Sequence, residues 1–119
     1  MNFDFYYMCV FCQIIKKQIN SEIVYEDEKM MVIKDINPKA PVHLLLFPKR
    51  HIESLVTLRL KDRLLIEGLI WKAKSLAEEQ GFASNGYKLV LNCGQGAGQV
   101  VPHLHLHLLS GADFSKWPV

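Results

Sequence analysis

Hydrophobic residues near the start of the chain recur at helical spacing. The members of this pattern are Phe11, Ile14, Ile15 and Ile19. They predict a short helix over residues 10–19 that begins near Cys9, and the polar pair Asn20-Ser21 ends it.

A longer apolar stripe with the same period occupies the middle of the chain. It consists of Leu60, Leu64, Leu65, Leu69, Ile70, Ala73, Leu76 and Ala77. The stripe predicts a long helix over residues 57–80, with Thr57 as its N-cap and Gly81 just beyond its end. A stripe this broad requires a sheet or a partner subunit to pack against.

Runs rich in β-branched and large apolar residues predict five strands. They cover residues 23–26, 29–34, 42–47, 87–92 and 101–109, with a hairpin turn at Asp27-Glu28 and an irregular loop at residues 35–41. Several of these strands are joined by short links. We therefore expect an α+β fold in which a mostly antiparallel five-stranded sheet packs with one long helix and one or two short helices.

Composition narrows the class of protein. The chain has 119 residues, of which 50% are hydrophobic and 22% charged, which suits one folded domain and excludes a disordered chain. A formal net charge of +2 is too small to indicate a partner such as a nucleic acid or a membrane surface. No apolar run approaches the roughly 18 residues that a membrane helix needs.

Targeting signals and disulfides are also not indicated. The aromatic-rich start of the chain carries Asp4 and lacks the basic region of a signal peptide. Three cysteines are too few, and odd in number, for a secreted disulfide scaffold. We expect a cytoplasmic protein with a single domain over residues 8–119, preceded by a tail at residues 1–7.

His103, His105 and His107 alternate with leucines, so a strand would place the imidazoles on one face and the leucines on the other. Neighbouring imidazoles would be about 6.6 Å apart and the outer pair roughly 13 Å, too far for one metal ion to bind all three comfortably. A row of imidazoles better suits an extended anion such as a polyphosphate. Histidine can attack phosphorus, donate a proton or hydrogen-bond a phosphoryl oxygen near neutral pH.

Residues 103–109 also match the His-φ-His-φ-His-φ-φ signature, where φ is hydrophobic. With this signature the chain resembles the histidine triad (HIT) superfamily. The resemblance extends through VFCQIIKKQI, IVYEDEK, KDINPKAPVHLLLFPKRHI and LNCGQGAGQ to Trp117-Pro118. It covers nearly the whole chain from Met8 and is to the Hint branch, the adenosine phosphoramidase type. It implies a HIT-like fold and a two-fold homodimer.

The resemblance also implies a mechanism. His105 would attack the α-phosphorus of a nucleotide and form a nucleotidyl-histidine, which water then hydrolyses. His107 and His103 would flank it, and His43 would complete the imidazole cluster. This chemistry requires no cofactor.

The positions that match nucleotide-binding residues are Phe11, Ile14, Asp35, Ile36, Asn92, Gly98, Gln99, Val100, His105 and His107. The resemblance implies that Asn92 and the backbone N–H groups of residues 94–99 hold phosphate oxygens and that Asp35 binds the ribose hydroxyls. It also implies that the apolar positions Phe11, Ile14 and Ile36 enclose the purine. From the residues alone, these three positions can equally be core, and Asp35 can be a turn former.

The chain departs from the family pattern at two places. Val100 stands where animal Hint proteins carry a serine that contacts the phosphate or the leaving group. This substitution shifts the assistance of the leaving group to Asn92, Gln99 and His43. Ser110-Gly111 replaces the usual Gly-Gly, and the tail before Trp117 is about one residue longer.

Cys9 and Cys12 form a CxxC pair, which by spacing is half of a zinc site and can equally be two buried cysteines on one helical turn. Some bacterial relatives, and the galactose-1-phosphate uridylyltransferases, pair this motif with two histidines. The resemblance places these histidines at His51 and His103 and implies a structural zinc ion. A zinc-bound His103 would orient His105 rather than shuttle protons.

Together these observations predict a homodimeric hydrolase of purine nucleoside phosphoramidates (AMP- or GMP-type) and related nucleotidyl adducts. Three alternatives remain open, and the first two are as follows. One is hydrolysis of dinucleoside polyphosphates, and the other is a nucleotide-binding interaction module whose hydrolysis is incidental. A catalytic metal enzyme using two of the triad histidines is a third.

Overall fold

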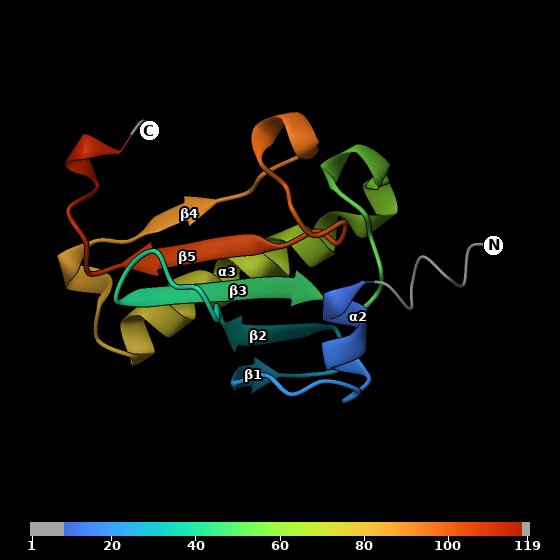
Figure 1. Ribbon diagram of the computed structural model, residues 1–119, viewed down its shortest axis with the longest axis horizontal. Helices are drawn as coiled ribbons and strands as arrows, with labels where there is room; N and C mark the ends of the chain where they lie inside the picture. The colour runs from blue at the N-terminus through green and yellow to red at the C-terminus, as the bar shows by residue number, and fades with distance from the viewer. Residues whose placement is uncertain (1–8, 118–119) are drawn as a thin grey trace.

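The computed structural model describes residues 9–117, so the predicted tail at residues 1–7 lies outside the described residues. Five strands form one sheet in the order β1-β2-β3-β5-β4, and every neighbouring pair is antiparallel (Figure 1). The strands are β1 (Ile23–Glu26), β2 (Met30–Lys34), β3 (Val42–Pro48), β4 (Lys88–Val90) and β5 (Leu106–Ser110). The helices are α2 (Val10–Ile15) and α3 (Arg63–Glu79), and short 3₁₀ turns lie in the segments around α3, between β4 and β5 and after β5. The predicted α+β fold with a five-stranded antiparallel sheet and one long helix is confirmed.

The two helices lie on opposite faces of the sheet (Figure 1). The alternation of side chains along each strand explains this arrangement. On β3, Leu44 and Leu46 pack toward α3, whereas Leu45 and Phe47 pack toward α2. The core under α3 also contains Val32, Leu69, Ala73, Leu76, Ala77, Phe82, Leu106 and Leu108. Among residues 9–117, no helix is long and apolar enough to cross a membrane.

Helix α2 is shorter than the predicted helix over residues 10–19. It ends at Ile15, because Lys17 adopts the left-handed conformation with φ 62°. The Lys17 amide donates to Ile14 O at 3.0 Å and the Gln18 amide to Gln13 O at 2.8 Å, which is the Schellman arrangement. Lysine at this position was not a recognisable stop signal, since glycine is the usual residue there.

Helix α3 begins six residues later than predicted. Thr57 belongs to a 3₁₀ turn capped by Ser54, and Asp62 is the residue that precedes the helix. The predicted C-terminal end is confirmed, with Gly81 at φ 83°. Half of the apolar stripe packs on the sheet, but Leu64 and Ile70 are exposed, as is Trp71 beside them.

The last strand also begins later than predicted. Residues 101–105 bend before β5, and the Leu104 amide donates to Ile52 O at 2.7 Å instead of joining the sheet. His103 and His105 therefore lie before the strand, and His107 lies within it. The alternation of side chains nevertheless persists, since Leu106 and Leu108 pack toward α3.

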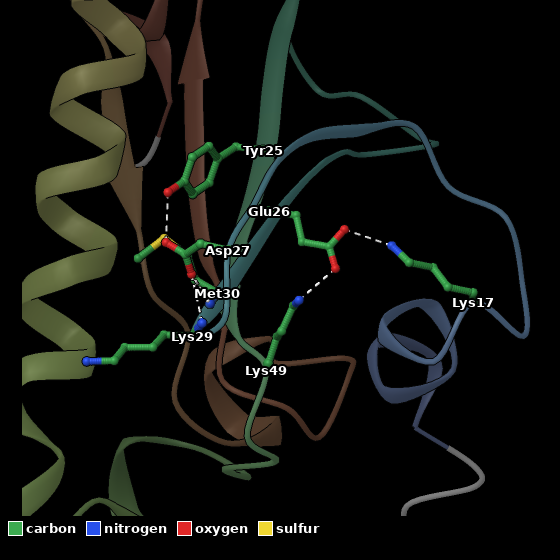
Figure 2. A network of polar contacts seen from close by, with 7 residues as sticks. All are labelled: Lys17, Tyr25, Glu26, Asp27, Lys29, Met30 and Lys49. Carbon is green, nitrogen blue, oxygen red and sulfur yellow. Dashed lines mark hydrogen bonds and ion pairs between the residues drawn. The ribbon is translucent and has the colours of Figure 1, made fainter.

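Polar contacts fasten the β1–β2 hairpin and the end of α2 (Figure 2). Glu26 accepts hydrogen bonds from Lys17 Nζ at 2.8 Å and from Lys49 Nζ at 2.6 Å. It therefore links the end of β1 to the segment after α2 and to the segment after β3. Asp27 accepts from the Tyr25 hydroxyl at 2.7 Å and from the backbone amides of Lys29 and Met30. The hairpin turn predicted at this aspartate is thus held by its own side chain.

Candidate active site

A cavity of about 580 Å³ lies on the α2 face of the sheet. It is lined by residues from α2, β2, β3 and β5, by the loop that follows β2 and by the loop that follows β4. The predicted site residues that line it are Phe11, Ile14, Asp35, Ile36, His43, Asn92, Gly98, Val100, His105 and His107. The fold therefore brings together residues that are up to 96 positions apart in the chain, from Phe11 to His107.

His105 is held in one orientation and one tautomer. Its Nδ1 lies 2.7 Å from the carbonyl oxygen of His103, and a carbonyl can only accept, so Nδ1 carries the proton. The lone pair of the neutral ring is therefore on Nε2. Because the side chain lines the cavity, this nitrogen is chemically able to act as a nucleophile or to accept a proton.

His43 and His107 form a second fixed pair. The backbone N–H of Lys39 donates to His43 Nδ1 at 3.0 Å, so the neutral His43 ring carries its proton on Nε2. His43 Nε2 lies 2.9 Å from His107 Nδ1 and donates to it. His107 is left with its proton on Nε2. The Lys39 amide was not anticipated from the sequence, because nothing in DINPKAP distinguishes it from other loop amides.

Burial lowers the pKa of each histidine of the cavity. Desolvation lowers the pKa of His105, and the hydrogen bond from its ring to the His103 carbonyl opposes this shift. Burial, with the nearby imidazoles of His105 and His43, lowers the pKa of His107 to about 4. Burial lowers the pKa of His43 too, against the attraction of Asp35. At neutral pH the rings are uncharged, which a nucleophilic imidazole requires.

One end of the cavity is apolar. Phe11 is buried, and its ring stacks on Phe47 with centroids 4.4 Å apart and meets His105 edge-on at 5.1 Å. Ile14 is also buried, whereas Ile36, which lines the cavity as well, is 85% exposed. Phe11 and Ile14 thus belong both to the core and to the cavity wall, and Ile36 belongs to the wall alone.

The loop between β4 and β5 supplies the polar rim. Asn92 lines the cavity while its side-chain amide donates to Ala97 O at 2.7 Å, and Gly98 and the exposed Val100 lie beside it. Gln99 is turned inward: its side chain donates to Glu53 O and Val101 O and accepts from the Gly94 amide. Gln99 therefore stabilises the loop and does not line the cavity.

A second cluster lies directly behind His105. The donor atoms of Cys9, Cys12, His51 and His103 all lie within 4.8 Å of one another. Cys9 Sγ is 3.3 Å and Cys12 Sγ 3.7 Å from His103 Nδ1, and Cys12 Sγ is 3.2 Å from His51 Nδ1. Tetrahedral zinc with bonds of about 2.3 Å to sulfur and 2.0 Å to nitrogen separates its ligand atoms by similar distances.

The surroundings of this cluster also fit a metal ion. His103 Nε2–H donates to Pro48 O at 2.7 Å, which frees the Nδ1 lone pair, and zinc-binding histidines usually donate their other N–H in this way. Burial raises the pKa of the Cys12 thiol to about 12, and Cys9 adds to the shift. A bound cation reverses this preference and favours thiolates. The cluster could therefore hold a zinc ion, and His103 faces it rather than the cavity. Cys93 lies outside the cluster.

Comparisons with known proteins agree with this arrangement. Residues 8–117 match the family model described as scavenger mRNA decapping enzyme C-term binding. The chain is 44% identical to a HIT-like protein of Synechocystis over 92% of its length and 94% of that protein. The chain belongs to the histidine triad superfamily.

Two further proteins that resemble this chain are named as enzymes. A purine nucleoside phosphoramidase of Escherichia coli is 36% identical over 86% of each chain. The structure of a HIT family hydrolase from Clostridium thermocellum superposes with a TM-score of 0.89 and 46% identity, covering 94% of this chain and 97% of that one. The chain is therefore a homologue of HIT hydrolases, including a phosphoramidase.

Proposed function

We propose that the protein hydrolyses purine nucleoside phosphoramidates and related nucleotidyl adducts through His105. Nε2 of His105 forms a bond to the α-phosphorus while the phosphorus–nitrogen bond to the leaving amine breaks, and the amine departs with a proton taken from solvent. Water then attacks the phosphorus and returns one proton to solvent, and the bond to Nε2 breaks to release a nucleoside monophosphate. The hydrogen bond from Nδ1 to His103 O carries this proposal, because it leaves Nε2 as the basic atom.

The neighbouring groups suit the charge that develops on phosphorus. His107, neutral and protonated on Nε2, can donate to a phosphoryl oxygen, as can the side-chain amide of Asn92. The apolar end at Phe11, Ile14 and Ile36 is of a kind that accepts a purine ring. The names of relatives support the same substrate class.

Replacing His105 with alanine tests the proposal. We expect hydrolysis of adenosine and guanosine 5′-phosphoramidates to be abolished while AMP still binds, since Nε2 supplies the bond and not the binding surface. Quenching the wild-type reaction in alkaline denaturant should trap a nucleotidyl adduct on His105, because its phosphorus–nitrogen bond survives alkali and hydrolyses in acid. Hydrolysis retained by His105→Ala would refute the mechanism. Faster turnover of dinucleoside polyphosphates than of phosphoramidates would instead identify the alternative substrate class.

We also propose that the cluster of Cys9, Cys12, His51 and His103 binds one zinc ion that fastens α2 to the sheet. The ion would supply structural cross-linking and no step of the reaction. Metal analysis of purified protein should give one zinc per chain, and Cys12→Ser should lose it. Cys93→Ser is the matched control, because it removes a thiol outside the cluster. Equal zinc contents in the two variants would contradict this site.

Finally, we propose a homodimer that covers the exposed part of the apolar stripe on α3. Leu64, Ile70 and Trp71 line a cleft of about 460 Å³ on this helix, on the side away from the sheet core. Exposed apolar groups gathered in this way are typical of interfaces. Light scattering should give twice the chain mass, and Trp71→Glu should give a monomer. A monomeric wild-type protein would refute this assembly.

A further inference from the structure

Asp35, His43 and His107 form a compact group at the cavity wall, with donor atoms within 4.8 Å of one another. Such a group can bind a metal ion or can direct a chain of protons. The backbone N–H of Lys39 decides between these possibilities, because it donates to His43 Nδ1. A metal on Nε2 would leave His43 without a proton on either nitrogen, and metal-binding histidines instead keep their other N–H as a donor. The group therefore directs a proton.

The carboxylate of Asp35 is aimed at that proton. Its Oδ1 accepts the backbone N–H of Asn37 at 2.8 Å, which fixes the side chain in a tight turn. Its Oδ2 lies 3.4 Å from His43 Nε2. The proton on Nε2 thus faces two acceptors, His107 Nδ1 at 2.9 Å and this carboxylate oxygen. Lys39 is the nearby cation, and its ammonium group donates to Asn37 O.

We propose that Asp35 is a positioning residue for the chemical step, in addition to any contact it makes with ribose. The carboxylate holds the proton of His43 on Nε2, and His43 in turn holds the proton of His107 on Nε2, where it faces the bound phosphate. This inference rests on the proposed function, since it assigns how that same site is organised. This role differs from substrate binding, because Asp35 would affect the chemical step even on a substrate that lacks the ribose hydroxyls.

The isosteric variant Asp35→Asn shows why the charge matters. Its Oδ1 can still accept from the Asn37 amide, so the turn is kept. Its amide group then presents a donor to His43 Nε2–H, where the carboxylate presented an acceptor. Two donors facing each other oppose the native tautomer of His43, which the Lys39 amide alone then supports, and this weakens the hydrogen bond that defines the tautomer of His107. A wrong tautomer in such a chain lowers turnover without weakening substrate binding.

Kinetics with two substrates separate the two roles of Asp35. One substrate is an adenosine 5′-phosphoramidate, and the other is its 2′,3′-dideoxy analogue, which has no ribose hydroxyls. On the dideoxy substrate we expect Asp35→Asn to lower kcat by at least about tenfold with little change in KM. Asp35→Glu, which keeps the acceptor, should recover part of the loss. Asn37→Ala is the matched control in the same loop, because it retains the backbone N–H that Asp35 accepts.

A spectroscopic measurement tests the tautomer directly. Nitrogen-15 shifts of the wild-type protein should place the His107 proton on Nε2, and in Asp35→Asn the ring should populate both tautomers. Equal kcat values for wild type and Asp35→Asn on the dideoxy substrate would overturn the inference, as would an unchanged His107 tautomer. If the wild-type protein hydrolyses neither phosphoramidate, the proposed function fails. The nitrogen shifts then decide the role of Asp35 without reference to activity.

Discussion

The ring of Phe11 belongs both to the core and to the wall of the cavity. It is 4% exposed, stacks on Phe47 and meets the edge of His105. Replacing it with alanine removes a buried ring, which costs about 3–5 kcal/mol in well-packed cores. For a chain of 119 residues the entropy of unfolding is about 0.25 kcal/mol/K, so the melting temperature should fall by about 12–20 °C. Phe11→Leu, which refills most of the volume, should lose only about 4–6 °C.

Ile36→Ala is the matched comparison, because Ile36 lines the same cavity but is 85% exposed. Its melting temperature should change little, since exposed positions contribute within about 0.5 kcal/mol. Its Kd for AMP should rise roughly fivefold, from about 1 kcal/mol of lost apolar contact. Thermal unfolding by circular dichroism and calorimetric AMP titration measure the two effects. If Phe11→Ala melts within about 3 °C of the wild type, the ring stack does not support the core and the reasoning fails.

Other positions allow simpler tests. Lys17→Gly should raise the melting temperature by about 4 °C, because glycine relieves the left-handed backbone at a cost of one exposed ion pair; a lower value would contradict this. Val100→Ser should speed the release of poor leaving groups in stopped-flow assays without altering stability. Hydrogen bonds from Tyr25 and two backbone amides lower the pKa of Asp27 against the opposing effect of burial. That stability is lost as the pH falls through the lowered pKa, so Tyr25→Phe should shift acid unfolding to higher pH.

The types of element were predictable from residue type and period. β2 and β3 are short runs of β-branched and large apolar residues buried on both faces, and the 3.6-residue stripe of α3 is set by the face that must be buried. The ends of the helices and strands were less predictable, because the same local sequence signal can precede different elements. Ser54 and Thr57 make a capping arrangement that looks the same whether a 3₁₀ turn or a long helix follows. Alternation also could not show where β5 begins, since it specifies side-chain direction and not backbone pairing.

The candidate site was predictable in its residue types and less so in its contacts. Spacing by itself pointed only to the Cys9–Cys12 pair and the row of three histidines, and the family resemblance pointed to the other residues of the metal cluster and of the cavity. Neither could show that His103 and His105 lie before β5 and not within it, because the bend before β5 is a tertiary feature. Nor could either show that Gln99 turns inward to the backbone of Glu53 and Val101. Contacts between distant loops have no local pattern from which to be inferred.

Helix α2 has six residues, too few for a helix to persist on its own in water. Its stability therefore comes from the packing of Phe11 and Ile14 on the sheet, supplemented by the contacts of the cysteines at its start and by the Lys17–Glu26–Lys49 contacts after its last turn. Amide hydrogens of this segment should then exchange together, as one cooperative unit, and more slowly when the cluster is filled. Because the same unit carries Phe11 and Ile14, its opening would also loosen one wall of the cavity.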